Sequence, residues 1–367
     1  MKDEQYMHMA LKLARKGLGT TSPNPMVGAV LVKGGKVIGT GYHKKSGGHH
    51  AEVAAIHDAK EEAKGATLYV NLEPCVHQGK TPPCTDAVIQ AGIKKVVVGM
   101  LDPNPQVNGR GVQTLRKAGM EVKVGMLEEE AKRLNEAFIV SMERKRPFFT
   151  MKGAVSLDGK LATKTCDSKW ISNEESRKHA DSLRSVSDGI MVGINTVIAD
   201  NPLLIPKMTR PKKIPVRIVL DSKLRIPLAC DMVKTSEKYA TWIFTGDDAR
   251  PDKEAKLKSM GIDVIRVHRD ENGRVSLAQI CDELYKRGIV SVLVEGGGEV
   301  NSSLLKEGLI DKIVLFYAPI MIGGKASFNL VGGKGIDFLK DAYRIDIVTL
   351  KRFKDDICIE GYVHRNH

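Results

Sequence analysis

The chain has 367 residues, more than one hydrophobic core usually serves, so we expect two domains. Charged residues make up 28% of it, and no apolar run is long enough for a membrane-spanning helix, which argues against an integral membrane protein. The net charge is +13, but the basic residues are interleaved with acidic ones, and aromatic residues make up only 5% of the chain. The chain therefore lacks the stacking platforms of a single-strand nucleic-acid binder, and we expect phosphorylated small molecules as partners.

The first half alternates between helical and strand patterns. Helices are predicted at 4–16, 51–63, 85–91, 111–118 and 127–142. Strands are predicted at 26–32, 36–42, 67–71, 95–99 and 121–124. This order is typical of a sheet with helices on both faces, a three-layer α/β/α domain.

A metal-binding pattern lies within this half. His50 and Glu52 are separated by one residue, and farther along a Pro-Cys pair at Cys75 is followed by Cys84 after eight intervening residues. One imidazole and two thiolates give Zn²⁺ three protein ligands and leave its fourth tetrahedral position for water, as in catalytic zinc sites. The metal would lower the pKa of that water to about 7, and the non-ligating Glu52 would move protons to a departing amine. The pattern is therefore typical of zinc-dependent base deaminases.

The spacing also predicts local structure. Residues two apart on a continuous helix point to nearly opposite faces, so His50 and Glu52 cannot both address one water molecule from the middle of a helix. We therefore expect His50 at a helix start. Cys84 follows two prolines and is also expected to open a helix, where the positive end of the dipole favours a thiolate.

Two unrelated buried cysteines and a surface histidine are the alternative interpretation of this pattern. The Glu two residues after His50 and the Pro before Cys75 both favour the catalytic zinc site. Within the His-His pair, the His-x-Glu spacing selects His50. We expect His49 to be a packed or solvent-facing neighbour.

The remaining cysteines show no paired spacing. We expect them to be reduced and partly buried; they are Cys166, Cys230, Cys281 and Cys358. The stretch from Met1 to Glu4 carries charges of both signs with no apolar segment behind it, so we expect neither a secretory signal nor a transit peptide. Both features predict a cytoplasmic protein.

The pattern divides after the basic run at 144–146. Pro147 breaks the long predicted helix, and a second α/β pattern begins at Phe148, so we expect domains at 1–146 and 147–367. We interpret the basic run itself as a solvated helix end or linker.

A glycine-rich turn follows a buried-strand pattern at 289–294 in the second half. Glu295 and the glycines Gly296 to Gly298 lead into a helical pattern at 300–307, and such a turn exposes backbone N–H groups to a phosphate. Three glycines also make an ordinary tight turn, and their spacing is not G-x-G-x-x-G. The turn alone leaves both interpretations open.

Together these residues resemble a known family. The chain resembles the bifunctional deaminase/reductase family of riboflavin biosynthesis in the runs GHHAE, PCVHQGKTPPC, KGAVSLDGKLAT, GINTVIADNPLL, LDS and VEGGGEVNSSLL. The resemblance covers essentially the whole chain. Most zinc base deaminases have two residues between the cysteines, whereas the eight-residue insert with Gly79, Lys80 and Thr81 is a feature of this family's amino-terminal domain.

The resemblance implies two successive steps on one phosphorylated pyrimidine. The first domain, similar to the cytidine-deaminase fold, would use Zn²⁺ to hydrolyse the 2-amino group of 2,5-diamino-6-ribosylamino-4(3H)-pyrimidinone 5′-phosphate. The second, similar to the dihydrofolate-reductase fold, would use NADPH to reduce the ribosyl group and give 5-amino-6-(5-phosphoribitylamino)uracil. Members of this family form homo-oligomers, and we expect one here.

The resemblance implies roles for individual residues of the first domain. The implied zinc ligands are His50, Cys75 and Cys84, and the implied proton shuttle is Glu52. The implied substrate positions of the first domain are Asn24, His43, Ala51, His77, Lys80, Asp102 and Asn104. Lys80 offers a cation to an anionic substrate, and Asn24 can donate to and accept from a pyrimidine edge. Asn24 between two prolines is also typical of a turn, and 102–105 is also typical of a loop after a strand.

The resemblance also implies roles for residues of the second domain. The implied cofactor or catalytic positions are Lys152, Ala154, Trp170, Thr196, Asp200, Ser222, Gly296, Gly297 and Gly298. The implied substrate positions are Ser168, Arg184, Leu204, Lys207 and Glu295, with Glu295 close to the ribose. Hydride transfer asks little of acid–base side chains, so the protein has to hold the nicotinamide against the sugar carbon. By residue type alone, Trp170 is more typical of a core than of a cofactor site.

One segment departs from the family pattern. After Leu204 the family usually has Thr-x-Arg, whereas this chain has Ile205, Pro206 and Lys207, with Arg210 slightly downstream. An ammonium group is a single point of charge, whereas a guanidinium binds phosphate in a bidentate manner. We expect a weaker phosphate contact here unless Arg210 compensates.

Two other functions compete with this one. A nucleic-acid deaminase would use the same zinc pocket and would suit a pI near 9.3, but it leaves the scarcity of aromatic residues and the second domain unexplained. A non-enzymatic, zinc-stabilised binding module explains neither Glu52 nor the open fourth coordination position. Of the three, only the deaminase/reductase is expected both to hold zinc and to bind NADPH.

Overall fold

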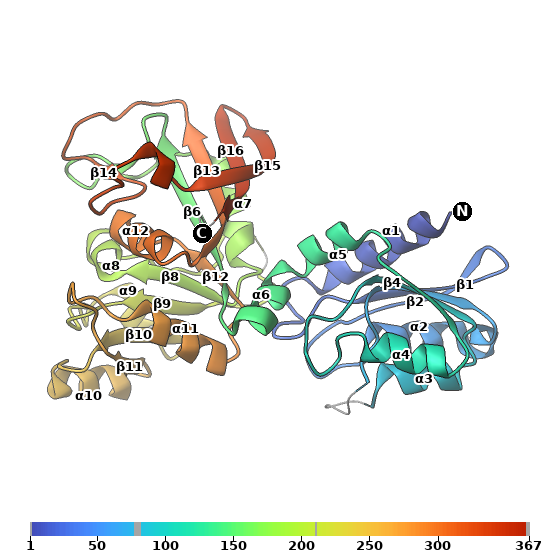
Figure 1. Ribbon diagram of the computed structural model, residues 1–367. Coiled ribbons are helices and arrows are strands. Elements are labelled where there is room, and N and C mark those ends of the chain that lie inside the picture. Colours follow the sequence, from blue (N-terminus) through green and yellow to red (C-terminus); the bar gives the residue numbers. More distant parts are fainter. Residues whose placement is uncertain (1, 77–81, 210, 365–367) are drawn as a thin grey trace. The chain divides into compact units, whose positions relative to one another are not determined.

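The structure is a computed structural model that describes residues 2–76, 82–209 and 211–364. The chain divides into two compact units, Met1–Arg146 and Pro147–His367, whose elements are labelled in Figure 1. Each unit is described by itself.

The first unit is built on a mixed five-stranded sheet in the order β2-β1-β3-β4-β5. Its strands are β1 (Gly28–Lys33), β2 (Lys36–Tyr42), β3 (Thr67–Leu72), β4 (Lys95–Met100) and β5 (Glu121–Val124). Strand β1 is antiparallel to both of its neighbours, whereas β3, β4 and β5 run parallel. All five predicted strands are confirmed, with ends that shift by at most two residues.

Helices cover both faces of this sheet (Figure 1). They are α1 (Asp3–Ala14), α2 (Ala51–Ala59), α3 (Cys84–Gln90), α4 (Arg110–Lys117), α5 (Glu128–Leu134) and α6 (Glu136–Arg144), with 3₁₀ turns at Arg15–Gly17 and Lys60–Ala63. Ala29 and Leu31 of β1 pack with α2, α3 and α4, whereas Val30 and Val32 pack with α1 and α5. Successive strand residues point to opposite faces, so the predicted three-layer arrangement is confirmed.

Two predicted helices are not continuous. The segment 51–63 is α-helical only to Ala59, and Lys60, with a φ of 51°, leads into the 3₁₀ turn Lys60–Ala63. The segment 127–142 was expected as a single helix, but it forms α5 and α6 with a break at Asn135, whose φ is −108°. The buried amide of Asn135 accepts a hydrogen bond from the N–H of Met26 at 2.8 Å and donates one to its carbonyl at 3.0 Å. The helix therefore breaks at a residue whose side chain pairs with the main chain before β1.

Small residues bring α2 directly against the edge strand β2. A Cβ atom on Gly41 would lie 2.3 Å from the carbonyl oxygen of Ala51, and one on Gly39 would lie 2.4 Å from that of Ala55. No larger residue fits at these two positions without moving backbone. Because α2 cannot shift away from the sheet without losing this packing, its first turn is held in a fixed place.

The second unit contains a nine-stranded sheet in the order β11-β10-β9-β8-β12-β6-β13-β16-β15. Its strands are β6 (Phe148–Ser156), β8 (Gly189–Gly193), β9 (Val216–Leu220), β10 (Thr241–Gly246), β11 (Asp263–Val267), β12 (Ser291–Val294), β13 (Ile310–Ala318), β15 (Arg344–Phe353) and β16 (Asp356–His364). The strands from β11 to β13 are parallel, and β16 and β15 extend them as an antiparallel hairpin. A two-stranded sheet pairs β7 (Lys160–Ala162) with β14 (Phe328–Asn329).

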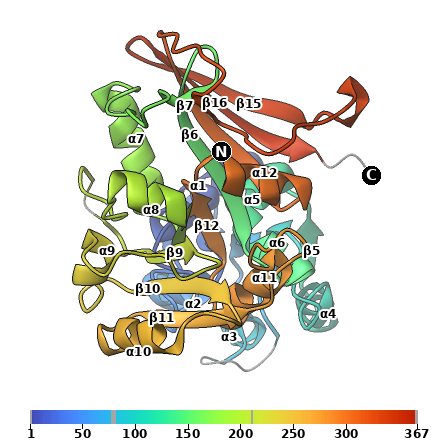
Figure 2. The same cartoon turned by 90° about the vertical axis from the view of Figure 1, so that its left-hand side faces the viewer.

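Helices also cover both faces of this sheet. They are α7 (Glu174–Arg184), α8 (Ile194–Asp200), α9 (Asp231–Lys234), α10 (Pro251–Ser259), α11 (Leu277–Lys286) and α12 (Gly298–Lys306), with a 3₁₀ turn at Leu339–Asp341. Helices α11 and α12 pack on one side with Phe149 and Phe244, and α8, α9 and α10 pack on the other with Val219 and Ile243, as Figure 2 shows for α8, α9, α11 and α12. The central strands are buried on both faces, which explains their continuous apolar runs.

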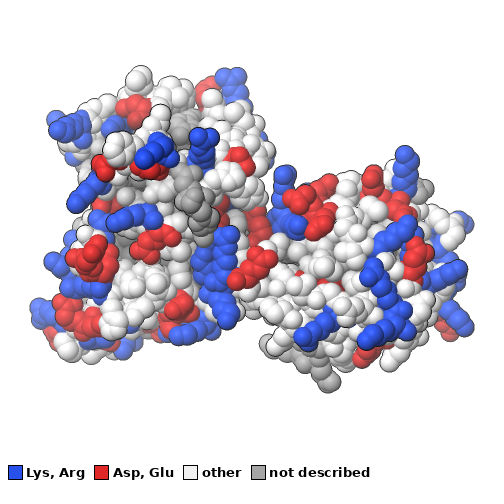
Figure 3. Space-filling model, viewed as in Figure 1, with Lys and Arg blue, Asp and Glu red and all other residues white. Residues whose placement is uncertain are grey.

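Charged side chains of both signs cover the surface (Figure 3), and the cysteines are unpaired. Figure 3 shows basic side chains next to acidic ones on both units. Within the described ranges, no helix combines the length and the apolar character needed to cross a membrane. All six cysteines are free thiols, but Cys166 is exposed rather than partly buried, in contrast to Cys230, Cys281 and Cys358. The expectation of burial is therefore wrong for Cys166.

Candidate active sites of the two units

The three predicted zinc ligands meet at the ends of elements in the first unit. His50 is the N-cap of α2, and Cys84 is the first residue of α3, so both predicted helix starts are confirmed. Cys75 lies in the segment that follows β3. The two helix starts and this segment therefore bring one imidazole and two thiols together.

The geometry of this cluster suits zinc. The ligand atoms of His50, Cys75 and Cys84 all lie within 4.8 Å of one another. The Nδ1 atom of His50 is 3.6 Å from the Cys75 sulfur and 2.9 Å from the Cys84 sulfur. Zinc bonds of about 2.3 Å to sulfur and about 2.1 Å to nitrogen, set at tetrahedral angles, place the two ligand atoms about 3.6 Å apart. A zinc ion thus requires only a small displacement of Cys84.

Protons are unevenly distributed over this cluster. The Cys84 thiol donates to Cys75, and this hydrogen bond lowers the pKa of Cys75 to about 4 and raises that of Cys84. Glu52, in the first turn of α2, is 3% exposed, and burial, followed by the charge of Cys75, raises its pKa to about 7. The cluster therefore offers a thiolate for a metal and a carboxyl group that exchanges its proton near neutral pH.

A second group of potential metal ligands lies in the other unit, at His179, Cys358 and Glu360. The Glu360 carboxylate already lies 3.8 Å from the ammonium groups of both Lys312 and Lys351. Two fixed cations at this distance oppose the binding of a third. We therefore do not assign a metal site here.

Asn24 and His43 form a hydrogen-bonded pair beside the zinc cluster. The ring of His43 lies 5.4 Å from that of His50, and its Nδ1 is 3.0 Å from the carbonyl oxygen of His49, which is exposed as expected. A carbonyl only accepts, so Nδ1 carries the proton and Nε2 accepts from the Asn24 amide nitrogen at 3.1 Å. Burial lowers the pKa of His43, which keeps the ring neutral. The amide oxygen of Asn24 is thereby directed away from His43 and can serve a ligand.

The other predicted substrate positions of this unit lie on two segments. Ala51 is the first residue of α2 and is fully buried beside Glu52. Asp102 and Asn104 lie in the loop that connects β4 to α4, where the N–H of Asn104 donates to the Asp102 carboxylate at 2.9 Å. The remaining two positions, His77 and Lys80, lie outside the described residues.

In the second unit, three predicted residues form a charged triad. The guanidinium group of Arg184 donates to Glu295 through two hydrogen bonds of 2.6 and 2.7 Å, and Lys152 lies 3.5 Å from the same carboxylate. Burial alone would raise the pKa of Glu295, but Arg184 and Lys152 outweigh it and hold the pKa at about 2. The same pairing raises the pKa of Arg184. Two cations against one anion leave the triad with a net positive charge.

The glycine-rich turn allows other groups to approach its backbone closely. Residues Glu295 to Gly297 connect β12 to α12, and the first N–H groups of α12 have no acceptor within the helix. A Cβ atom on Gly298 would lie 2.6 Å from the carbonyl oxygen of Asn329, whereas at Gly297 the nearest atom would be the Thr196 hydroxyl at 3.5 Å. Gly297 is therefore open towards Thr196, which lies in the first turn of the neighbouring α8. The turn fits the phosphates of a nucleotide cofactor.

The remaining cofactor positions lie mostly near the same edge of the sheet. Thr196 and Asp200 belong to α8, which follows β8 directly, and Ser222 follows β9. Ala154 lies two residues after Lys152 on β6. Ligands of open α/β sheets bind where the carboxyl ends of parallel strands meet, and these positions obey that rule.

Trp170 is exposed, which corrects the interpretation of this residue as core. Its exposed fraction is 70%, and the guanidinium carbon of Arg177 lies 4.6 Å from its ring centroid. The predicted substrate residue Ser168 lies two positions earlier and is half-buried. An exposed indole next to a charged group is available for stacking on a ligand.

The departure from the family pattern lies in a segment whose main chain is held by one carboxylate. Leu204 is buried and has a positive φ of 50°, and the side chain of Lys207 is exposed. Asp181 of α7 accepts from the N–H groups of Lys207, Met208 and Thr209 at 2.8, 2.9 and 2.9 Å. The segment is therefore fixed through its backbone. Arg210 lies outside the described residues.

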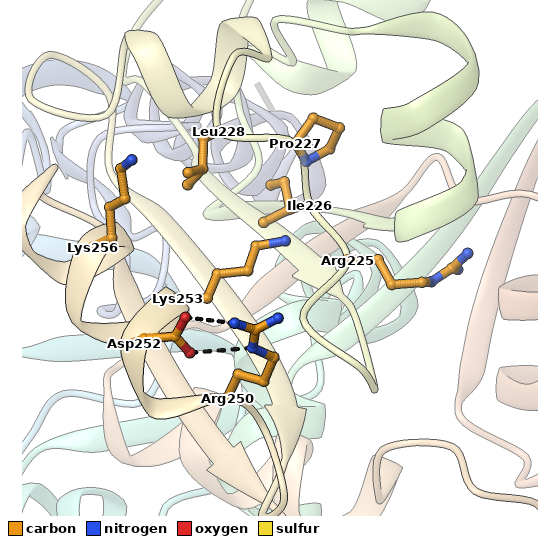
Figure 4. Close-up of a pocket in the computed structure, with 8 residues that line it drawn as sticks. All are labelled: Arg225, Ile226, Pro227, Leu228, Arg250, Asp252, Lys253 and Lys256. Carbon is orange, nitrogen blue, oxygen red and sulfur yellow. Dashed lines mark hydrogen bonds and ion pairs between the residues drawn. The ribbon is translucent and has the colours of Figure 1, made fainter.

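A basic surface hollow lies elsewhere in the second unit. Figure 4 shows Lys253 and Lys256 of α10 beside Arg225, with Arg250 paired to Asp252. None of the predicted site residues lines this hollow. It is therefore not part of the candidate site.

Sequence reasoning missed two buried acids. Glu73 and Asp181 both accept hydrogen bonds from the main chain of loops that carry predicted substrate residues. A signal was present for each, because Glu73 directly precedes the Pro-Cys pair and Asp181 lies one helical turn before Arg184. Neither signal was specific, since an isolated acid at such a place is most often solvated.

Family models match both units. Residues 147–359 match the family described as RibD C-terminal domain. Residues 1–100 match the family described as cytidine and deoxycytidylate deaminase zinc-binding region. These two matches agree with the predicted fold class, a cytidine-deaminase-like domain followed by a reductase domain.

Full-length relatives carry the same pair of units. The chain is 46% identical over 357 residues to the riboflavin biosynthesis protein RibD of Aquifex aeolicus, covering 97% of each chain. It is 44% identical over 364 residues to that of Actinobacillus pleuropneumoniae, covering 99% of this chain and 96% of the relative. A solved structure of Acinetobacter baumannii RibD superposes with a TM-score of 0.88 at 34% identity over 99% of both chains. The bifunctional deaminase/reductase structure from Thermotoga maritima gives 0.85 at 38% identity over 98% of both.

The zinc cluster leads to a direct test by metal analysis. Cys75→Ser and Cys84→Ser each replace a thiolate with a hydroxyl that is not ionised near neutral pH, so we expect the zinc content of the purified protein to fall well below one per chain. Cys358→Ser serves as the matched control, since it removes a thiol from the group that we do not assign to a metal. Full zinc content in both cysteine variants would mean that the metal binds elsewhere.

Proposed function

Because the chain belongs to the RibD family of riboflavin biosynthesis proteins, we propose that its residues 1–146 and 147–367 catalyse two successive reactions on one phosphorylated pyrimidine. The chain is a bifunctional enzyme, a zinc-dependent deaminase and an NADPH-dependent reductase of riboflavin biosynthesis. The observation that carries the proposal for the first unit is the convergence of His50, Cys75 and Cys84 next to the buried Glu52.

The two reactions follow each other on the same molecule. The first unit hydrolyses the 2-amino group of 2,5-diamino-6-ribosylamino-4(3H)-pyrimidinone 5′-phosphate and releases ammonia. The second unit then reduces the ribosyl group of the deaminated product, for which NADPH would supply a hydride and solvent a proton, and this gives 5-amino-6-(5-phosphoribitylamino)uracil. The net positive charge of the Lys152, Arg184 and Glu295 triad suits an anionic substrate.

In the first unit, His50, Cys75 and Cys84 would hold the zinc ion. Bound there, zinc would supply a water molecule whose pKa is lowered to about 7. Glu52 takes up a proton on its carboxylate and delivers it to the leaving amino nitrogen. A general acid–base group works best when its pKa lies near the working pH, and burial brings the pKa of Glu52 to about 7.

The pyrimidine is positioned by residues around the zinc cluster. Asn24 presents its amide oxygen to the pyrimidine edge because His43 accepts from its amide nitrogen at 3.1 Å. Asp102 and Asn104 contact the substrate from the loop after β4, and Ala51 lines the site. His77 and Lys80, which lie outside the described residues, belong to this set by sequence, and Lys80 would offer a cation to the anionic substrate.

In the second unit, NADPH binds at the carboxyl edge of the parallel strands. The glycines Gly296 to Gly298 hold its phosphates, and Thr196, Asp200 and Ser222 line the same edge. Lys152 and Ala154 of β6 and the exposed Trp170 are the further proposed cofactor positions. The substrate is held by Ser168, Arg184, Leu204, Lys207 and Glu295, with Glu295 next to the ribose. Their task is orientation, since the cofactor supplies the hydride.

The partners of the protein are small molecules rather than nucleic acids, and it works in the cytoplasm. Acidic side chains interspersed among the basic ones in Figure 3 and the aromatic content of 5% support the first statement. The six free thiols support the second, since a reducing compartment keeps cysteines unpaired.

The functional form is a homo-oligomer that forms through strand β15. This ten-residue strand is the edge of the nine-stranded sheet and exposes Ile347 and Leu350 by 59% and 67%. The segment that enters it exposes Phe338 and Leu339 by 64% and 90%. An apolar edge strand of this length is normally covered, and a second copy paired about a twofold axis covers it symmetrically.

The deaminase proposal predicts the behaviour of Glu52→Gln. This variant keeps its zinc, because Glu52 does not bind the metal, but it loses the proton shuttle and should deaminate about 10²- to 10⁴-fold more slowly. Product mass and zinc content are the measurements. Reduction of deaminated substrate by the same variant should be unchanged, and Glu61→Gln on the exposed 3₁₀ turn is the matched control. Normal deamination by Glu52→Gln would remove Glu52 from the mechanism.

The departure at Lys207 generates a second prediction. If Lys207 binds the substrate phosphate, Lys207→Ala loses a charged hydrogen bond, which lowers kcat/KM of the reductase by about 10- to 150-fold. Steady-state kinetics should show an increased KM for the deaminated substrate and a nearly constant KM for NADPH. Arg210→Ala is the parallel variant. Normal kinetics in both would show that other groups bind the phosphate.

The oligomer proposal is tested by light scattering during size-exclusion chromatography. Leu350→Glu places a charge on the apolar edge strand, so we expect the assembly to dissociate at concentrations where the wild type remains associated. Leu18→Glu changes a residue of similar type that is exposed on the other unit and serves as the control. Equal masses for Leu350→Glu and the wild type would contradict the proposed interface.

A further inference from the structure

Glu73 is a buried acid that the zinc and substrate assignments leave without a role. It follows β3 directly and is 2% exposed. Its Oε2 accepts from the N–H of Asp102 at 3.2 Å and from that of Gly109 at 2.9 Å, and its Oε1 accepts from the N–H of Val112 at 2.9 Å. One side chain thus satisfies three main-chain donors, which is a strongly bound and well-fixed arrangement for a carboxylate.

These three donors mark both ends of the loop that carries two proposed substrate residues. Asp102 starts the loop after β4, Gly109 ends it as the N-cap of α4, and Val112 lies in the first turn of that helix. Within the loop, the Asp102 and Asn104 side chains accept from main-chain N–H groups two residues ahead, at 2.9 and 3.0 Å. The loop is therefore locally ordered by its own side chains and fastened at both ends by Glu73.

The main chain of Glu73 continues directly to a proposed zinc ligand. Its own N–H donates to the carbonyl oxygen of Met100 at 3.0 Å, and Pro74 and Cys75 follow it in the chain. Helix α4 lies very close to this segment, since a Cβ atom on Gly111 would lie 2.2 Å from the carbonyl oxygen of Pro74 and 3.0 Å from the Glu73 side chain. Glu73 thus connects the segment that carries the zinc ligand Cys75 with the loop that carries the proposed substrate residues.

We propose that Glu73 is a positioning residue of the deaminase, which fixes the loop carrying Asp102 and Asn104 relative to the zinc ligand Cys75. The inference rests on the proposed function of the first unit. Glu73 acts through the loop and does not need to contact the substrate. Without its two oxygens the loop ends lose their acceptors, and the substrate-binding side chains are no longer held at a set distance from the metal.

Asp181 has the corresponding arrangement in the second unit, and a separate set of contacts carries this second inference. It is 4% exposed, and both its oxygens accept from the segment Lys207 to Thr209, including the hydroxyl of Thr209 at 2.9 Å. One helical turn later, Arg184 forms the bidentate pair with Glu295. Asp181 is thus the positioning residue that sets the Leu204 to Thr209 segment relative to Arg184 in the reductase.

The test uses Glu73→Gln in the full-length, zinc-loaded protein. Glutamine keeps the size of the side chain but replaces one acceptor oxygen by an amide that donates, so at least one loop contact becomes repulsive. We expect the KM for the diaminopyrimidine phosphate to rise about 10- to 100-fold, with kcat and zinc content nearly unchanged. Loss of zinc, a fall in kcat alone, or an unchanged KM would overturn the proposal.

Gly111→Ala provides an independent variant if Glu73→Gln does not fold. It removes no hydrogen-bonding group, but its Cβ atom has to push α4 away from the Glu73 segment. The same increase in KM with full zinc content is expected, and an unchanged KM overturns the proposal. Asn104→Ala, added to Glu73→Gln, should raise the KM by less than it does in the wild type, because the loop is already displaced.

Asp181→Asn is the matched variant in the other unit. We expect it to raise the KM of the reductase for the deaminated substrate by about 10- to 100-fold, while the KM for NADPH and the deaminase rate stay constant. The full zinc content of Glu73→Gln and the unchanged KM for NADPH of Asp181→Asn are the folding controls, since a destabilised unit would lose its own metal or cofactor binding. A KM for the deaminated substrate that stays at the wild-type value in Asp181→Asn overturns its assignment.

These outcomes separate the inference from the function on which it rests. If the wild-type protein with bound zinc does not release ammonia from the diaminopyrimidine phosphate, the proposed function of the first unit fails. If the wild type is active and Glu73→Gln has the same KM, the function stands and the positioning role fails.

Discussion

Parallel strands end at one edge of their sheet, and both sites of this protein depend on that constraint. In the first unit, β3 and β4 lead to the segments that carry Cys75 and Asp102. In the second, β8, β9 and β12 lead to Thr196, Ser222 and Gly298. The chain after each strand turns into a loop or a helix start, so unsatisfied N–H groups and polar side chains accumulate at this edge. In our proposal the first unit uses this arrangement to hold a metal, and the second uses it to hold the phosphates of the cofactor.

The two buried glutamates of the candidate sites, Glu52 and Glu295, have different pKa values because their neighbours differ. Glu52 and Glu295 are both almost completely enclosed, yet burial raises the pKa of Glu52 to about 7, whereas Arg184 and Lys152 hold that of Glu295 at about 2. A carboxyl group that gains and loses a proton near neutral pH serves hydrolysis, which moves protons. A permanently ionised carboxylate serves orientation, which hydride transfer requires. The difference lies in the neighbouring cations and not in the residue type.

Local patterns in the sequence predicted much of this fold, because strands and amphipathic helices reflect contacts with their own sheet. The His50 and Cys84 helix starts were predictable for the same reason, since the geometry of a helix is known in advance. The break at Asn135 and the exposure of Trp170 were predicted wrongly. Asn135 binds the main chain of Met26, more than a hundred residues earlier, and no local pattern encodes such a partner. Glu73 and Asp181 were missed for the same reason.

The way in which the Lys207 segment is held explains why its side chains can depart from the family pattern. Asp181 binds the segment through main-chain N–H groups of Lys207, Met208 and Thr209, which every residue except proline possesses. Replacing Thr-x-Arg by Ile205, Pro206 and Lys207 leaves these donors intact, because the proline falls one residue before the first of them. The path of the main chain therefore does not depend on which cationic side chain the segment carries. If Lys207 binds the substrate phosphate as we propose, the change from guanidinium to ammonium alters the strength of that contact without moving the loop that carries it.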